Sequence, residues 1–505
     1  MATIQNTAGM SLQAIAQQLT PGATPQQELR SKGNDLYVKQ GTKFFTDVQS
    51  RTDHRNSALA LVKGAIERDL GIDSNTAQKF MSRVMTGQQN GQTGQITTGD
   101  LARLNKAVDL AGHFSGSPGT CAFRGSIAES LVHMGLTEAA AVDIVKALGG
   151  NTTRDLFRAL EANDMARLAQ LVGALPNTPE TVDALQKIEA ALVAKADGND
   201  LSHPALTPPC HRVFYTKRTE ALENVIQGKL QLSGDLRLTA TLARLPKQEY
   251  WRLLMDGRHH GNGDKHFFDR SKGYMGSMMA GLNHIVDTVG TPLSPAYIQS
   301  LHTVSTTSVT KEMRTDDAIP LSKTNNMFQL AGVVKQAPNT WGVCSSFTDD
   351  GMRELLAIRQ DLQAQLPLGS PPFFTDDQNA KSDNNRPGVV QAWKAGNPGD
   401  PNLPQTVNTL VQYAVDQGAR DLAAARSDDE KLGAIIDTCR RLGSIHPFED
   451  ANGRLMMFLV LNKLLLDNGF SPTILQDQGH MIGKSRDELI VLIKAGQAQL
   501  DQLLH

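Results

Sequence analysis

A helix–turn–helix stretch in the C-terminal part of the chain constrains the fold more than any other feature. The apolar pattern predicts a helix over residues 432–445. That helix must stop at His446, because Pro447 follows and disfavours helical geometry in the residue before it. A second, strongly apolar helix is expected over residues 452–466. The sequence therefore predicts two buried helices that meet at a short polar corner, residues 446–454.

The rest of the hydrophobic pattern is also mostly helical. Residues 55–195 are typical of consecutive amphipathic helices. Thr178 followed by Pro179 predicts one helix start, and Ser126 with Glu129 predicts another through a capping box. Few stretches alternate with a period of two, so the fold class is mainly α.

The chain has 505 residues, enough for two or three domains. We expect a disordered polar leader over residues 1–40, because Gln, Thr, Ser, Ala and Gly dominate it and no charged residue precedes Glu28. A helical domain for partner binding or localisation is predicted over 45–196. After a Gly-, Asn- and Pro-rich break, a catalytic region is predicted over 210–505. A second Pro- and Gly-rich interruption covers residues 366–404.

Composition narrows the class of partner. The formal net charge is −2, so no overall basic field favours nucleic acid. No apolar run approaches the ~20 residues that a bilayer-spanning helix needs, so no membrane span is expected. The four cysteines form no closely spaced pair, which indicates neither a zinc ribbon nor a disulfide framework.

The polar corner contains the residues that phosphoryl transfer requires. A helix beginning at Asn452 presents free backbone N–H groups to an anion, and Gly453 permits close approach of a ligand. Arg454 would pair with phosphate, and Asp450 is a suitable ligand for Mg²⁺ beside phosphate oxygens. His446 is the candidate general base, since a neutral imidazole accepts a proton near pH 7.

The segment from His446 to Arg454, His-Pro-Phe-Glu-Asp-Ala-Asn-Gly-Arg, resembles the signature of the Fic family, HPFx(D/E)(G/A)N(G/K)R. The similarity continues into residues 464–472 and covers 290–500 more loosely. It implies a Fic-type helical core with a short β-hairpin flap, which would lie at residues 330–346.

The resemblance also implies roles. His446 would deprotonate a Tyr, Ser or Thr hydroxyl of a target protein, for example a host GTPase or kinase. Asp450 would bind Mg²⁺, while Asn452, Gly453 and Arg454 would hold the phosphates of ATP or UTP. The expected reaction is protein AMPylation or UMPylation.

Two departures from the family pattern leave alternatives open. Met457 stands where many adenylylating members have a second arginine, which leaves room for UTP or another diphosphate donor. Ala451 is shared with a branch that phosphorylates proteins, although Gly453 favours nucleotidyl transfer over that branch. Phosphocholine transfer, kinase activity and a catalytically silent binding module are the alternatives.

The inhibitory helix that many Fic proteins carry has no good match. The nearest segment, Ser308 to Glu312, lacks the following Gly or Asn. The polar leader resembles those of type III secretion substrates. Together, the leader and the poor match to an inhibitory helix favour a virulence effector that a bacterium delivers into the host cytoplasm. The bacterial cytoplasm is the alternative location.

Overall fold

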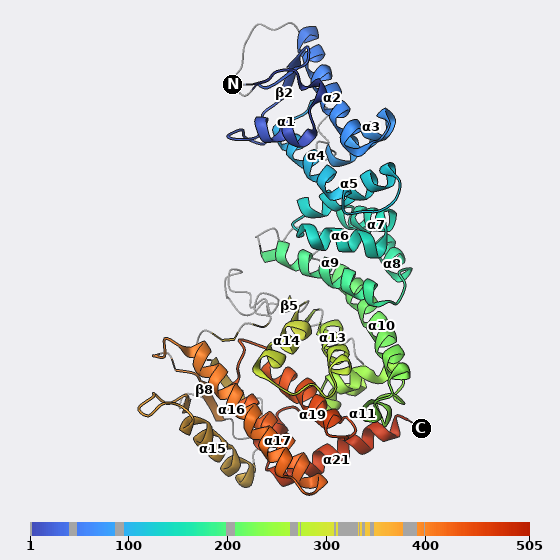
Figure 1. Cartoon of the computed structure of the whole chain (residues 1–505). Coiled ribbons are helices and arrows are strands. Elements are labelled where there is room, and N and C mark those ends of the chain that lie inside the picture. Colours follow the sequence, from blue (N-terminus) through green and yellow to red (C-terminus); the bar gives the residue numbers. More distant parts are fainter. Residues whose placement is uncertain are drawn as a thin grey trace. The chain divides into compact units, whose positions relative to one another are not determined.

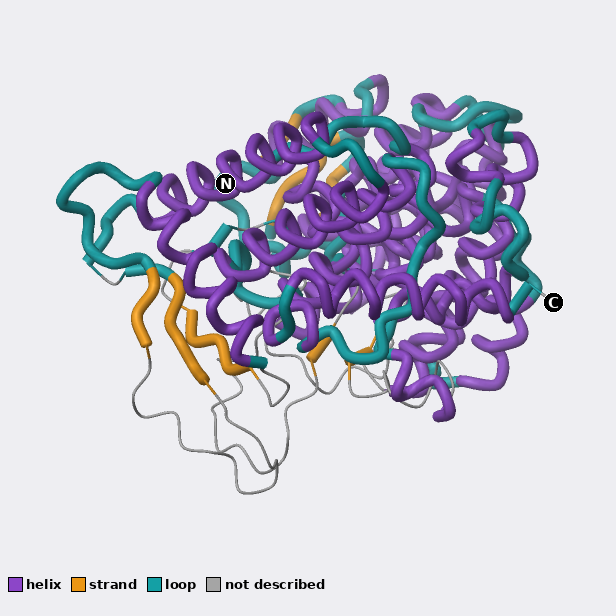
Figure 2. The backbone as a smooth tube through the Cα atoms, turned by 90° about the horizontal axis from the view of Figure 1, so that it is seen from below, coloured by secondary structure: helices purple, strands orange, loops and turns teal. Residues whose placement is uncertain are grey.

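We analysed a computed structural model of the chain, shown in Figure 1. It describes residues 3–39, 48–85, 95–197, 208–262, 271–272, 274–307, 310–311, 332, 334–335, 339–343, 348–376, 391–397 and 399–504. Helices dominate, and the strands, orange in Figure 2, are short, so the prediction of a mainly α fold is confirmed. No helix among the described residues combines the length with the apolar character that crossing a bilayer requires.

The chain divides into two compact units. Unit 1 comprises residues 1–175 and 194–205, and unit 2 comprises residues 176–193 and 206–505. The described helices of unit 1 are η1 (Thr7–Gly9), α1 (Leu12–Leu19), α2 (Val48–Leu70), α3 (Ser74–Met85), α4 (Thr98–Ala111), α5 (Pro118–His133), α6 (Glu138–Leu148), α7 (Gly150–Glu161) and α8 (Met165–Gly173).

Residues 3–39 are folded, so the prediction of a disordered leader is wrong for them. β1 (Thr3–Ile4), β3 (Asp35–Val38) and β2 (Leu29–Lys32) form an antiparallel sheet in the order β1-β3-β2. The apolar residues of the segment are placed where they can be buried. α1 directs Leu12, Ile15 and Leu19 into the same hydrophobic cluster as residues of α2 and α3. Burial against later helices supplies the apolar contacts that the segment could not make alone.

Unit 2 surrounds the polar corner. Its described helices are α9 (Pro179–Asp197, through residue 193), α10 (Pro208–Leu232), α11 (Leu236–Thr239), η3 (Lys247–Leu254), η4 (Gly257–Asn262), α13 (Tyr274–Asp287), α14 (Pro295–Thr306), α15 (Asp349–Ala364), α16 (Leu403–Ala424), α17 (Asp428–Ile445), α18 (Asn452–Arg454), η6 (Leu455–Val460, a π-helix), α19 (Leu461–Asp467), α20 (His480–Gly483) and α21 (Arg486–Gln502).

The chain first passes from unit 1 to unit 2 between residues 175 and 176, earlier than the Gly-, Asn- and Pro-rich break predicted at 197–209. Most of α9 belongs to unit 2, because Val182 enters that unit's hydrophobic cluster. The buried carboxylate of Glu189 also pairs with the buried guanidinium of Arg218 on α10, which in turn donates to Ser277 Oγ at 3.0 Å. The chain crosses between the units three times, and the last crossing, between residues 205 and 206, lies within the predicted break.

The two helices predicted at the polar corner form the centre of unit 2. α17 packs against α15, α16, α19 and α21, and almost every residue from Leu432 to Ile445 is buried. The helix that begins at Asn452 continues through η6 into α19, where residues 455–466 are all buried. A helix that is apolar on all sides is stable only inside the protein. Both ends of the corner are therefore anchored in the core.

The predicted β-hairpin flap takes a different form in the described residues. β6 (Asn339–Val343) pairs with β8 (Gln391–Ala395), and β8 pairs with β7 (Phe374–Asp376). Nearer to the corner, Val334 forms an antiparallel bridge with Phe448. In the part of the chain that the structure describes, residues 334–343 therefore pair with the segment 374–395 and with the corner, not with one another. In the sequence, α15 separates β6 from its partner β8. A shorter two-stranded pair joins β4 (Ser271–Lys272) and β5 (Thr310–Lys311).

Candidate active site

His446 ends α17 in an unusual backbone conformation. Its φ and ψ are 51° and 62°, in the left-handed region that few residues other than glycine adopt. Its backbone N–H still donates to Leu442 O at 3.2 Å, so the residue closes the helix. Pro447 then prevents helical continuation. Strained backbone of this kind is often found at functional sites, and here it turns the imidazole out of the helix at the start of the corner.

Asn452 fixes the shape of the corner from inside. Its side chain is buried, its Oδ1 accepts from Phe448 N–H at 2.8 Å, and its Nδ2 donates to Phe448 O at 2.7 Å. The same Nδ2 lies 3.3 Å from His446 Nδ1. The resemblance implies that Asn452 contacts phosphate. In the structure its amide instead faces the loop interior, where it closes the turn and touches the candidate base.

His302 supports the corner from α14. It is buried, its ring stacks on Phe448 with centroids 3.9 Å apart, and its Nε2 contacts Asp450 O at 3.0 Å. Its Nδ1 accepts from Gly332 N–H at 2.8 Å, so the neutral tautomer carries its proton on Nε2. Burial lowers the pKa of His302 from 6.5 to about 4. A neutral histidine therefore joins residue 332 to the corner.

Acid should weaken this support. Because the pKa of His302 is lower in the folded chain than its usual 6.5, stability is complete above pH 6.5 and falls as the pH drops toward 4. At about 1.4 kcal/mol per pH unit, the loss reaches about 3 kcal/mol. We expect thermal melts between pH 7.5 and 4.5, in EDTA, to show a shallower decline for His302→Gln than for the wild type. Parallel declines would contradict this role.

The imidazole of His446 is neutral near pH 7. Burial lowers its pKa to about 3; the Lys335 ammonium acts in the same direction and Asp450 acts against it. The residue is only partly enclosed by the protein. A neutral ring can accept a proton, and negatively charged phosphates bound beside it would raise its pKa toward the working pH that suits a general base.

Asp450 and Ala451 complete the turn before the second helix. Asp450 Oδ1 accepts from Ala451 N–H at 2.6 Å, and Ala451 has a φ of 66°. Among the described residues no group of three or more His, Cys, Asp or Glu side chains is arranged to hold a metal ion. One carboxylate at a helix start suits Mg²⁺, which binds one or two carboxylates and takes its other ligands from phosphates and water. The metal role of Asp450 stays a prediction.

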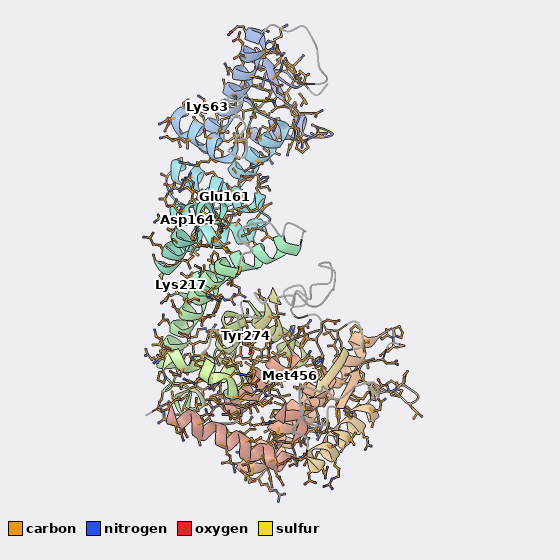
Figure 3. All side chains as sticks on the ribbon, turned by 180° about the vertical axis from the view of Figure 1, so that it is seen from behind. Lys63, Glu161, Asp164, Lys217, Tyr274 and Met456 are labelled. Atoms are coloured by element: carbon orange, nitrogen blue, oxygen red, sulfur yellow. The ribbon has the colours of Figure 1, made fainter. Side chains whose placement is uncertain are left out.

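Arg454 and Gly453 lie in the first turn of the second helix. The Arg454 guanidinium carbon is 4.8 Å from the centre of the Tyr274 ring, and Tyr274 Oη donates to Leu254 O at 2.7 Å. No carboxylate among the described residues pairs with Arg454. A Cβ on Gly453 would lie 2.8 Å from Oε1 of Gln478, which is the end of a flexible side chain and can move aside. Figure 3 labels Tyr274 on α13 and Met456 on the helix that carries Arg454.

The structure thus brings all five predicted site residues to one corner. Met457, one turn beyond Arg454, is buried against the position of Gly443 on α17. The nearest match to an inhibitory helix, Ser308–Glu312, lies mostly outside the described residues. Sequence reasoning did not assign a role to His302, Tyr274 or Lys335. His302 and Lys335 stand out because their side chains are buried, and burial cannot be read from the sequence.

Comparison with known proteins gives one partial similarity. No protein-family model matches the chain. Over 90 residues, 18% of the chain, it is 30% identical to phosphocholine transferase AnkX of Legionella pneumophila. That match covers 10% of AnkX, so the chain corresponds to about a tenth of the length of this relative. The similarity is to a transferase, and it does not specify the group transferred.

Proposed function

We propose that this chain is a Fic-type protein-modifying enzyme that transfers a nucleoside monophosphate from ATP or UTP to a hydroxyl of a target protein. The observation that carries the proposal is the corner itself. A neutral imidazole, a carboxylate and an arginine without a carboxylate partner among the described residues meet where a long buried helix begins. This is the arrangement that proton transfer and phosphate binding need together.

The proposed reaction balances as a substitution at phosphorus. The target hydroxyl oxygen forms a bond to the α-phosphorus, and the bond between that phosphorus and the pyrophosphate oxygen breaks. The hydroxyl proton passes to His446, and pyrophosphate leaves. His446 lies at the end of one anchored helix and the phosphate-binding turn at the start of another. Positioning of the two reactants can therefore supply much of the rate enhancement.

The phosphates would be bound by the helix start. Backbone N–H groups in the turn at Gly453 face no carbonyl of a preceding helical turn, and Arg454 adds a positive charge with two parallel donors. Mg²⁺ held by Asp450 would neutralise part of the phosphate charge. The stacking of Arg454 on Tyr274 limits its rotation, so less side-chain freedom is lost when a phosphate binds.

The contact between Asn452 and His446 adds a requirement. The two hydrogen bonds to the Phe448 backbone identify which atom of the Asn452 amide is oxygen and which is nitrogen. The group that faces His446 Nδ1 is therefore the NH₂ donor. A neutral ring that accepts at Nδ1 carries its proton on Nε2. If the target hydroxyl approaches Nε2, His446 must first shift its own proton to Nδ1 and give up this 3.3 Å contact. If the hydroxyl approaches Nδ1, it must displace the Asn452 amide.

Phosphocholine transfer is the second candidate. It is favoured by the similarity to a phosphocholine transferase and by Met457, whose buried side chain cannot supply a second phosphate-binding charge. A CDP-choline donor has two phosphates and needs fewer positive charges than a triphosphate. Its transferred group would be phosphocholine, with CMP leaving. The same His446 base and helix start would serve this reaction.

One labelling experiment separates these reactions. Purified protein is incubated with Mg²⁺, target-bearing bacterial or eukaryotic lysate, and ATP, UTP or CDP-choline in parallel, beside the variant His446→Asn. Mass spectrometry then identifies any AMP, UMP or phosphocholine adduct. An AMP or UMP adduct made by the wild type alone supports nucleotidyl transfer, and a phosphocholine adduct replaces it with the second candidate. If no donor yields an adduct, the binding-module interpretation is preferred.

For unit 1 we propose partner binding. A cavity of about 680 Å³ is lined by α3, α5 and the start of α7, and its described lining includes Lys79, Arg83 and Arg124 but no carboxylate. Such a cavity suits an acidic surface of a partner. In the labelling experiment, Arg124→Glu should reduce modification of the natural target without changing modification of an unrelated peptide. Equal loss on both substrates would contradict a role in target binding.

Delivery into a host cell remains a proposal. Because residues 3–39 are folded, the unstructured leader no longer supports it. The remaining support is the poor match to an inhibitory helix and the large N-terminal unit. A translocation reporter fused to the full chain, expressed in a bacterium with a type III system, tests it directly. Retention of the reporter inside the bacterium would favour a bacterial target.

A further inference from the structure

Lys335 is a fully buried lysine beside the candidate base. Its side chain has 0% exposure, and its ammonium donates to Ile445 O at 2.8 Å and to Ala395 O at 3.0 Å. The Phe373 ring lies 5.3 Å from the same nitrogen. Ile445 is the last residue of α17 and directly precedes His446. The ammonium therefore reaches the carbonyl end of the helix on which the candidate base is mounted.

The backbone of Lys335 holds the other side of His446. Lys335 N–H donates to Pro447 O at 2.9 Å, and Val334 forms an antiparallel bridge with Phe448. One residue thus binds the carbonyls of Ile445 and Pro447, the two residues that flank His446. The first contact holds the peptide unit that enters His446, and the second holds the chain one peptide unit beyond the one that leaves it. Its third contact, to Ala395, joins the same point to the end of β8.

The charge of Lys335 is costly at this position. A buried ammonium loses its hydration, and burial lowers the pKa of Lys335 to about 7, with Glu449 acting in the opposite direction. No carboxylate among the described residues lies within ion-pair distance of its ammonium. Replacement of a buried ion by an apolar side chain of similar size is often neutral or stabilising. Core packing alone therefore does not explain a lysine here, whereas two carbonyls that need a donor do.

We propose that Lys335 is a positioning residue for His446. Its ammonium holds the end of α17 and its backbone N–H holds Pro447, so that His446 keeps its left-handed backbone conformation and its imidazole keeps its place. The proposal rests on the proposed function, in which His446 is the base. It adds a residue more than 100 positions away in the sequence, and it connects the β6-β8-β7 sheet to the base through Ala395.

The variant Lys335→Met removes the ammonium and keeps a flexible side chain of similar length. Lys463→Met is a matched control. Lys463 is also a fully buried lysine of unit 2, but it donates to Thr291 O at 2.9 Å and pairs with Asp467, and none of its recorded contacts is with the corner. Both variants remove a buried charge, so both are expected to alter the melting temperature. Only Lys335→Met should disturb His446.

Two measurements on the full chain decide the proposal. In ¹H–¹³C spectra of protein labelled at histidine Cε1, the His446 signal, assigned by its loss in His446→Asn, should move in Lys335→Met and stay in place in Lys463→Met. With the donor found by labelling, kcat should fall about 10- to 100-fold in Lys335→Met while KM for that donor changes less than about threefold, as expected for misplacement of the base alone.

An unmoved His446 signal together with an unchanged kcat overturns the proposal. So does an equal loss of kcat in Lys463→Met, since the effect would then follow stability. The spectrum requires no turnover, so it tests Lys335 even if no donor supports transfer, whereas absence of wild-type activity counts against the proposed function alone. If Lys335→Met does not fold, Lys335→Gln, which retains a polar donor, is measured in the same way, and an unmoved signal there overturns the proposal equally.

Discussion

Replacement of His446 by asparagine should leave the chain folded and reduce group transfer about 100- to 10,000-fold, the range expected for loss of a general base. Asparagine is the most informative replacement because it tolerates left-handed backbone better than alanine does. The φ of 51° at this position would add strain to an alanine variant and confuse lost chemistry with lost structure. Initial rates with saturating donor and target measure the effect.

The expected signature of this variant is a loss in kcat with little change in donor affinity. His446 touches the hydroxyl in the proposed mechanism, while the phosphates are bound by the helix that starts at Asn452. Calorimetric titration with the donor, or with a non-hydrolysable analogue of it, should therefore give dissociation constants within about threefold of the wild type. A variant that retains more than about a tenth of the wild-type rate would remove His446 as the base.

Local signals in the sequence predicted the corner well because its geometry is local. A proline after the histidine ends one helix, and the apolar run after Asn452 begins the next. Thr178 with Pro179 was equally informative: α9 begins at Pro179, and Thr181 N–H donates to Thr178 Oγ1 at 3.3 Å. In each case the residues that determine the structure lie within four positions of one another.

The same kind of signal was wrong at Ser126 and Glu129. Both lie inside α5, where the Ser126 hydroxyl donates to Phe123 O and Glu129 accepts two hydrogen bonds from Arg103 at 2.7 and 2.9 Å. The true start of that helix is capped by Ser117, whose Oγ accepts from Thr120 N–H. A serine followed three residues later by glutamate fits a capping box, but here a long-range ion pair determines where the glutamate lies.

Long-range contacts also explain what the sequence left out of the site. His302 and Lys335 lie more than 100 residues before the corner, and each is recognised by its bonds to carbonyls of residues 445–450. The residues next to His302 and Lys335 in the sequence do not predict these hydrogen bonds. Asn452 shows the converse: its place in the corner was predicted, but its amide is bonded to Phe448 within the loop and so stabilises the turn.

Replacement of Arg454 by glutamine should weaken donor binding about 10- to 100-fold, because one charge-assisted contact to phosphate is typically worth about 1.5–3 kcal/mol. The guanidinium stacks 4.8 Å from the centre of the Tyr274 ring, and no carboxylate among the described residues competes for it. Little stability should be lost, since the residue is only partly buried. Titration with the donor in the presence of Mg²⁺ measures the change.

Two further variants identify the reason for that loss. Arg454→Lys retains the charge but loses the planar fork and its stacking on Tyr274, so its donor affinity should lie between those of the wild type and Arg454→Gln. Arg441→Gln is the matched control: this arginine of α17 is paired with Asp421 at 3.2 Å, and donor affinity should stay unchanged. If Arg454→Gln binds the donor within twofold of the wild type, the phosphates are bound elsewhere, and the start of this helix is only a structural corner.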